Sequence, residues 1–331
     1  LRFSGGNGND SLFFGEDNGG FNFFGSVQAL MAAGNDQIHV NDDEFIAVNS
    51  FLAANGDGNN TTGLDPVVEL FLGTTTIPGG SGTDFIDLGD ELVTTGFITV
   101  SSGNGDNEFF MDGNITVNGN ITVIGGSGPD NFEPGDFGNN PQLTVNGSIT
   151  AALGEGENFT EFASDNVDVT GFISVTGGSG NDTFDFDTLT FDVAAISLVL
   201  GAGNNDVLLN EGATTIRSNL SITTLGGADE IIGFGLDVFG ATTITTGEGI
   251  DLIELDNSRH RSVVTVSTGG GNDTIRVENI TNDGIGSRFD SLVSIDLGAG
   301  TDSIFIGLDA NDFARFFNRV IVNGGAGTDT I

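Results

Sequence analysis

The chain contains no cysteine, no tryptophan, no tyrosine and no lysine, and only five prolines. The absence of cysteine excludes disulfides, thiolate metal centres such as zinc fingers and iron–sulfur clusters, and thiol nucleophiles. No apolar run reaches the roughly 18 residues that a membrane-spanning helix needs, and the first four residues carry no signal-peptide pattern. Both ends fall inside a repeat, which predicts that the sequence is a segment of a longer chain.

Positive charge is scarce, because eight arginines stand against 47 acidic residues and the formal net charge is −39. Nucleic acid and anionic membrane surfaces are bound through positive charge, so neither is an expected partner, and membrane insertion is not expected. An acidic excess of this size also repels itself within a compact fold. Bound divalent cations would relieve that repulsion.

A glycine and aspartate signature, Gly-x-Gly-x-Asp-x-apolar, recurs about every 24 residues along the chain. The acidic or amide position of each copy, here called the turn mark, follows the previous one by 22 to 29 residues. The marks are Asp10, Asp36, Asn60, Asp84, Asn107, Asp130, Asn158, Asp182, Asn205, Asp229, Asp251, Asp273, Asp302 and Asp329. A fixed period of this size predicts a solenoid, in which each repeat packs only against its neighbours. We therefore expect residues 1–331 to form one continuous domain.

Apolar side chains recur two and four positions after most turn marks, as Ile86 and Leu88 do after Asp84. Such alternation is typical of a strand with one buried face. A second apolar pair lies nine and seven residues before many marks, as in Ile98 and Val100, and predicts a second strand. The variable segment between the two could hold a third. The sequence thus predicts an all-β, right-handed parallel β-helix of about 14 coils, with minimal helix.

The turn offers oxygen ligands for a cation. Glycines permit positive φ and a close approach of backbone carbonyls, and the mark adds a carboxylate at the same corner. Consecutive coils of a β-helix lie about 4.8 Å apart, so a column rich in aspartate repels itself unless cations lie between the carboxylates. Ca²⁺ takes about six to eight oxygens of these kinds. The sequence therefore predicts calcium in the turn column.

The copies with the marks Asp10, Asp84, Asp130 and Asp182 match the nonapeptide GGxGxDxUx at every fixed position. In these windows the chain resembles the RTX-type calcium-binding repeats of secreted bacterial proteins. The resemblance implies that turn carbonyls and stacked carboxylates hold Ca²⁺, that calcium drives folding after export, and that these four aspartates are the best ligands. The family's repeats follow one another directly, whereas this chain has one copy per coil, which favours a wider β-helix over the family's compact β-roll.

We expect metal ligands at the aspartate marks and at two acidic residues three positions after a mark. The set is Asp10, Asp36, Asp84, Asp130, Asp182, Asp229, Asp251, Asp273, Asp302, Asp329, Asp87 and Asp185. The asparagine marks are poorer ligands because their side chains are neutral. The alternative is a metal-free ladder, in which Asp and Asn side chains close the turns by hydrogen bonds and the acids after the marks form a solvated face.

A polysaccharide lyase or hydrolase is an alternative function, because many β-helix proteins cleave acidic polysaccharides with basic or carboxylate groups. This chain has no lysine, and its two histidines, His39 and His260, lie on distant coils. The segment Arg259-His260-Arg261 is the basic cluster, and it could approach Arg288, Arg315 and Arg319. Pairing with carboxylates, or contact with a neighbouring subunit, is the competing interpretation of that cluster.

The combined patterns favour a protein that is not an enzyme, namely a calcium-stabilised rod serving as a fibre, surface layer, matrix component or adhesin stalk outside the cell or on its surface. Unpaired strand edges at the coil ends predict self-association, end to end or laterally. Cell-surface glycans are a further candidate partner. A column of hydroxyls eight residues before the marks, including Thr99 and Thr122, could instead bind ice or carbohydrate, although such residues also suit any exposed sheet. Ca²⁺ is the one cofactor implied.

Overall fold

The computed structural model describes residues 1–14, 25–40, 46–64, 70–89, 92–94, 96–136, 141–209, 212–279, 285–307 and 313–331. The chain divides into two compact units, Leu1–Gly171 and Phe172–Ile331, which are described separately. All strand pairings given for the described residues are parallel, and these residues contain no helix. None of them therefore forms a helix suited to crossing a membrane.

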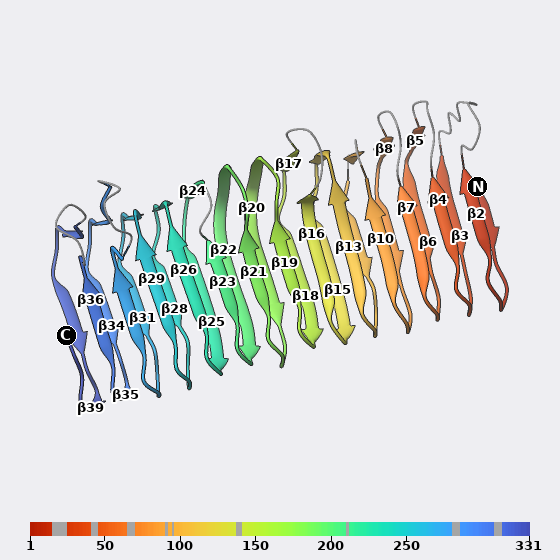
Figure 1. Ribbon diagram of the computed structural model, residues 1–331. Coiled ribbons are helices and arrows are strands. Elements are labelled where there is room, and N and C mark those ends of the chain that lie inside the picture. The colour runs from red at the N-terminus through yellow and green to blue at the C-terminus, as the bar shows by residue number, and fades with distance from the viewer. Residues whose placement is uncertain are drawn as a thin grey trace. The chain divides into compact units, whose positions relative to one another are not determined.

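In the first unit each complete coil has a strand after the turn, one in the middle and one before the next turn (Figure 1). The strands after the turns are β2 Ser11–Phe14, β4 Gln37–Val40, β7 Asn60–Leu64, β10 Asp84–Leu88, β13 Asn107–Asp112, β16 Asp130–Asp136 and β19 Phe159–Phe162. The middle strands are β5 Ile46–Val48, β8 Leu70–Leu72, β11 Leu92–Thr94, β14 Asn114–Val117 and β17 Gln142–Val145. Those before the turns are β1 Arg2–Ser4, β3 Ser26–Leu30, β6 Ser50–Ala54, β9 Thr75–Pro78, β12 Ile98–Ser101, β15 Ile121–Ser127 and β18 Ile149–Glu155. The long strand β20 Asn166–Gly177 crosses the sequence boundary of the units.

The second unit repeats this arrangement. Its strands after the turns are β21 Thr183–Phe186, β23 Asp206–Leu209, β26 Glu230–Phe234, β29 Leu252–Asp256, β32 Thr274–Val277 and β36 Ser303–Ile306. The long β22 Thr190–Ala202 serves as both middle and pre-turn strand, and is followed by the middle strands β24 Ala213–Ile216, β27 Leu236–Val238, β30 Arg259–His260, β33 Arg288–Phe289 and β37 Arg315–Phe316. The pre-turn strands are β25 Leu220–Gly226, β28 Thr242–Thr245, β31 Val264–Ser267, β34 Val293–Asp296 and β38 Val320–Asn323, and the short β35 Ala299–Gly300 and β39 Ala326–Gly327 lie in the turns.

Stacking of equivalent residues forms the core. Ile86 pairs in register with Phe109, which pairs with Phe132, and these side chains are no more than 3% exposed. The rings of Phe109 and Phe132 stack with their centroids 5.4 Å apart. Both apolar columns after the marks and the pair before them thus point inward, as the alternation predicted. Burial of these columns removes apolar surface from water in every coil and is the main force that holds the coils together.

The all-β parallel solenoid is confirmed, and the middle segment does hold a third strand. Within the described residues the sheet after the turns has 13 strands, which correspond to about 12 turns rather than the expected 14. One reason is that 14 marks enclose only 13 intervals. The other is that Asp329 is followed by only two residues, which are too few to form a strand. The right-handed sense and the single continuous domain stay predictions.

Candidate functional site: the turn column

The turn marks lie in a buried column at one edge of each unit. In Figure 1 this edge is the lower one, where the turn strands β35 and β39 lie. Asp36 and Asp84 are 1% and 0% exposed in the first unit, and Asp251 and Asp302 are 2% and 0% exposed in the second. Asp10 and Asp329, the first and last marks, are only half-buried. A carboxylate in such a position has lost most of its water and needs other partners.

At most marks one side-chain oxygen belongs to a ladder of hydrogen bonds between coils. Oδ1 of Asp36 accepts the backbone N–H of Asp10 at 2.8 Å, and Asp36 donates in turn to Oδ1 of Asn60 at 3.0 Å. The second unit has the same bond from Asp251 to Asp273 at 3.0 Å and from Asp273 to Asp302 at 2.9 Å. The metal-free ladder that the sequence offered as an alternative is therefore present. The ladder uses one side-chain oxygen per mark. The second side-chain atom, Nδ2 of asparagine or Oδ2 of aspartate, has different hydrogen-bond partners at different marks.

At asparagine marks the second atom is a donor. Nδ2 of Asn107 donates to the carbonyls of Gly103 at 3.4 Å and Gly105 at 3.1 Å, and to Oδ1 of Asp130 in the next coil at 2.7 Å. At two of the motif-matching marks the second atom instead accepts a backbone N–H. Oδ2 of Asp10 accepts from Gly6 at 2.7 Å, and Oδ2 of Asp130 accepts from Gly126 at 3.2 Å.

A third group of marks has no donor for the second oxygen. Among the described residues, Oδ2 is buried without a hydrogen-bond partner at Asp36, Asp84, Asp229, Asp251, Asp273 and Asp302. The hydroxyl of Thr246 lies close enough to Asp251 to favour the charged form of that carboxyl, and it also approaches the carbonyl of Thr268 at 3.2 Å. Buried acceptors without donors are rare in folded proteins and usually indicate a missing water, ion or proton.

Burial also shifts the acidity of the column. It raises the pKa of Asp84 and of Asp130 to about 6, although hydrogen bonds from Asn60 and Asn107 act in the opposite direction. It likewise raises the pKa of Asp251, where the hydroxyl of Thr246 and the N–H of Asp229 partly offset the loss of water. Desolvation therefore disfavours the charged carboxylates of the column unless positive charge compensates them.

The donor set of the column suits a hard cation. Carboxylate and carbonyl oxygens are the ligands of Ca²⁺, and no soft ligand is present in the turns. No group of three or more His, Asp or Glu side chains with metal-binding geometry occurs within the described part of the chain, so any site here depends largely on backbone carbonyls. Asp87 and Asp185 do not join the column. They lie half-exposed on the outward face of β10 and β21, whereas Asp84 and Asp182 are buried.

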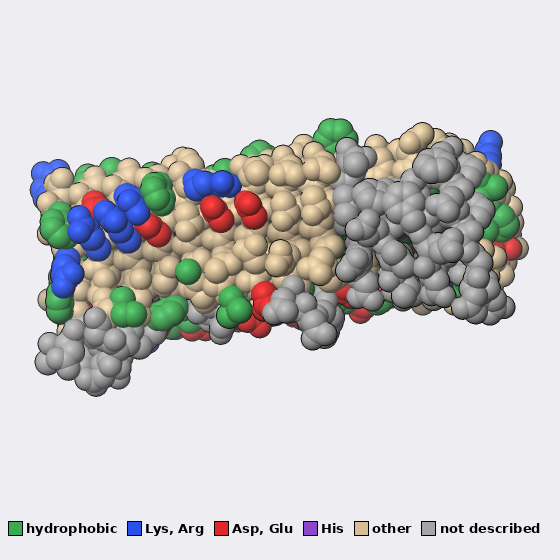
Figure 2. Space-filling view, turned by 90° about the horizontal axis from the view of Figure 1, so that it is seen from above, with side chains coloured by type: hydrophobic (Ala, Val, Ile, Leu, Met, Phe, Trp, Pro, Cys, Tyr) green, Lys and Arg blue, Asp and Glu red, His purple; other side chains and the backbone are tan. Residues whose placement is uncertain are grey.

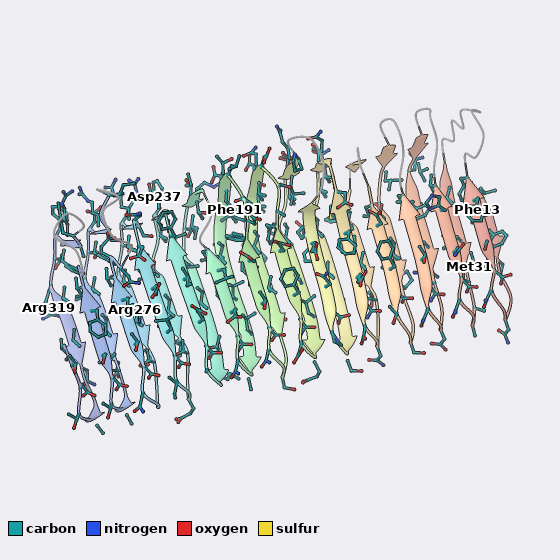
Figure 3. All side chains as sticks on the ribbon, in the orientation of Figure 1. Phe13, Met31, Phe191, Asp237, Arg276 and Arg319 are labelled. Carbon is teal, nitrogen blue, oxygen red and sulfur yellow. The ribbon has the colours of Figure 1, made fainter. Side chains whose placement is uncertain are left out.

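The arginines gather on a different part of the second unit. Arg259, Arg288 and Arg315 are adjacent in register on the middle strands β30, β33 and β37. Asp290 forms ion pairs with Arg259, at 2.9 Å, and with Arg288. Arg261 pairs with Asp237, which Figure 3 labels at the upper edge of its strand. We call these outward residues the arginine face; arginine and acidic side chains lie together on this surface in Figure 2.

His260 lies beneath the arginine face and is fully buried. Its ring stacks on Phe289 with centroids 5.1 Å apart, and Nδ1 is 2.9 Å from the hydroxyl of Thr242. Burial lowers the pKa of His260 to about 4. The basic cluster of the sequence thus separates into two half-exposed arginines and one core histidine.

No family model, no curated protein and no solved structure matches the chain. The site must therefore be interpreted from its own geometry.

Sequence reasoning missed the part that the asparagine marks play. Their lack of charge made them poor ligands, whereas the structure shows that their amides donate into the column. A signal was present in the sequence, because the marks alternate strictly between Asp and Asn from Asp36 to Asp229. The threonines beside the carboxylates, Thr246 and Thr268, were also not singled out.

Proposed function

We propose that the protein is a structural β-solenoid of an extracellular or cell-surface protein, stabilised by calcium bound in the turn column, and serving as a fibre, surface layer, matrix component or adhesin stalk. Self-association, contact with cell-surface glycans and a likeness to RTX-type repeats belong to the same proposal. The observation that carries it is the set of buried Oδ2 atoms without donors at Asp36, Asp229 and Asp302.

The chemistry of the column supports calcium over other occupants. The carboxylates are desolvated and stacked coil upon coil, so each extra negative charge costs free energy unless a cation shares it. Glycine carbonyls beside them add neutral oxygen ligands, which Ca²⁺ accepts in flexible geometry and Mg²⁺ accepts less readily. When bound, calcium would supply positive charge and crosslink neighbouring coils.

The test is thermal unfolding of the dialysed protein with EGTA, with excess Ca²⁺ and with excess Mg²⁺, together with metal analysis. Binding to the folded state alone stabilises by about 2.7 kcal/mol when the free ligand is at 100 times its dissociation constant. We expect a large loss of stability on chelation that Ca²⁺ restores and Mg²⁺ does not. An unchanged melt with no bound metal would remove calcium from the proposal and leave the hydrogen-bonded ladder alone.

The enzymatic alternative gains no specific support. A hollow of about 230 Å³ beside Asp130 is lined by the acidic residues Asp106, Glu108 and Glu157, and its lining includes neither arginine nor histidine. The arginine face lies on other strands of the second unit. Polysaccharide cleavage and ice binding therefore remain predictions from the sequence, with less support than the proposed structural function.

A further inference from the structure

The arginine face has fewer carboxylates than arginines, although the chain as a whole has a large excess of carboxylates. The sequence contains 47 acidic residues and only eight arginines. Arg259, Arg288 and Arg315 are nonetheless adjacent in register on β30, β33 and β37. Side chains in register on neighbouring strands lie about 4.8 Å apart, and like charges at this distance repel each other.

A single carboxylate serves this column of three arginines. Asp290 pairs with Arg259 at 2.9 Å and with Arg288. The equivalent position in the next coil, two residues after Arg315, holds Phe317 instead of an acidic residue. Arg315 therefore forms no ion pair within the described part of the chain, although it is exposed and lies in a very acidic protein.

Exposed phenylalanine rings orient the guanidinium groups of the face. The central carbon of the Arg261 guanidinium lies 3.9 Å from the ring centroid of Phe239, and that of Arg315 lies 4.3 Å from the ring centroid of Phe313. Such stacking occupies one face of a guanidinium and leaves the N–H groups at its edge to donate. The edge of Arg261 donates to Asp237, whereas Arg315 has no carboxylate to receive its N–H groups among the described residues.

The composition of the arginine face is typical of a protein interface. Arginine and aromatic residues are enriched at the centres of such interfaces, whereas lysine and glutamate are depleted. Phe239, Phe313 and Phe317 beside the arginines are 45%, 47% and 58% exposed. Figure 2 shows arginine and hydrophobic side chains together on this surface. Because arginine binds carboxylates through paired N–H groups, the partner surface should present carboxylates.

A second copy of the chain offers such a surface. Arg2 is the only arginine among residues 1–171, and the chain has no lysine. The exposed Asp106 and Glu108 of the first unit, for example, line a hollow whose lining includes no arginine. Two arginine faces would repel each other, so the contact must join unlike surfaces of two copies. A contact of this kind extends from copy to copy unless it closes into a ring.

We propose that the arginine face binds the carboxylate surface of the first unit of a second copy, and that Arg315 donates to a carboxylate of that copy. The proposal rests on the self-association included in the proposed function and assigns a surface to it. It does not depend on calcium in the turn column. The carboxylate of the second copy would also relieve the repulsion between Arg288 and Arg315.

The test is sedimentation velocity of the purified protein over a range of concentrations, at fixed salt and with excess Ca²⁺. We expect the weight-average sedimentation coefficient of the wild type to rise with concentration. Arg315→Glu should weaken the association about tenfold or more, because it replaces a donor with a like charge. Arg276→Glu is the matched control, because it reverses the same charge on β32, in the sheet after the turns. It should associate like the wild type, and thermal unfolding checks that both variants fold.

Mixing distinguishes unlike from like surfaces. Arg315→Glu keeps its carboxylate surface, so in an equal mixture with the wild type it should bind wild-type copies as a chain end and shorten their assemblies. If the variant stays apart from the wild type, the contact joins two identical faces and the proposal is overturned. Association of Arg315→Glu as strong as that of the wild type would likewise exclude the arginine face while self-association stands.

A wild type that stays monomeric at every concentration would overturn both this proposal and the self-association, whereas calcium binding is decided separately by the melt in EGTA. Retention of that monomer on a matrix of sulfated polysaccharide, with loss of retention for Arg315→Glu, would assign the arginine face to an acidic glycan instead of a second copy.

Discussion

The turn edge and the arginine face of the second unit hold their coils together in different ways. At the turn edge like residues stack, and every described rung repeats one hydrogen bond, as between Asp251 and Asp273 and between Asp273 and Asp302. On the arginine face the partners are unlike and diagonal. Arg261 pairs with Asp237 of the preceding coil, and Arg259 pairs with Asp290 of the following one.

This difference determines how strongly each region resists change. The marks of the turn edge are buried, and a Cβ atom added to glycines such as Gly249, Gly271 and Gly298 would overlap with the backbone of the preceding coil. The side chains of Arg259 and Asp290 are 38% and 19% exposed, so water screens their attraction. The closely stacked residues of the turn edge should therefore contribute far more stability per residue than the partly exposed ion pairs of the arginine face.

The largest expected effect is at the turn edge, for Gly271→Ala. A Cβ atom there would lie 1.3 Å from the carbonyl oxygen of Gly249, and the residue has a φ of 142°. Steric overlap with backbone and an unfavourable dihedral angle together should lower the free energy of unfolding by about 4 kcal/mol. Chemical denaturation of the calcium-loaded protein measures this change.

Gly226→Ala is the control, because Gly226 lies in the turn before Asp229 without a positive φ, and the nearest atom to its added Cβ would be 3.3 Å away. We expect an effect of about 1 kcal/mol or less. Equal losses for both variants would mean that close stacking does not set the stability of the turn edge.

The sequence was sufficient to predict the turn edge as a fold element but not its chemistry. The period and the alternation around marks such as Asp84 predicted the strands, because burial of one face in every coil leaves a regular signature. The turn conformation was not predictable. Gly125-Gly126 and Gly324-Gly325 have the same sequence, yet only Gly325 has positive φ, at 76°. The φ angle of this glycine determines which backbone atoms face the mark. Because the two sequences are the same, the angle must depend on packing against the neighbouring coils.

The arginine face was less predictable still. The sequence could place Arg259 and Arg288 near each other, because both lie in the middle segment of their coils. It could not identify Asp290 as their shared partner, or Asp237 as the partner of Arg261, since diagonal pairing depends on the register of coils whose lengths differ. It also gave no sign that His260, between two half-exposed arginines, points into the core.

The next effect concerns His260 beneath the arginine face and depends on pH. Its pKa is about 4 in the folded protein, against 6.5 for the ordinary group, because burial disfavours the charged ring. The unfolded chain therefore binds the extra proton first, and this contribution to stability is lost as the pH falls from about 6.5 to about 4. The difference corresponds to about 3 kcal/mol.

The measurement is the difference in unfolding free energy between the wild type and His260→Phe across that range. Phenylalanine keeps the stack on Phe289 but has no titrating group. Buried aspartates with raised pKa, such as Asp251, act with the opposite sign, and they cancel in the difference because both proteins contain them. A difference that does not change between pH 6.5 and 4 would show that His260 is not held neutral in the core.

The smallest effect should come from the arginine face itself, for Arg259→Ala. The substitution removes the two hydrogen bonds to Asp290, at 3.1 and 2.9 Å, while Arg288 remains as a partner for that carboxylate. We expect a loss of about 1 kcal/mol that shrinks in high salt. Arg217→Ala is the comparison, because Arg217 and Asp192 are 41% and 50% exposed, and its loss should be smaller. If Arg259→Ala costs as much as Gly271→Ala and salt has no influence, the two regions do not differ in the way proposed, and the arginine face is as rigid a part of the fold as the turn edge.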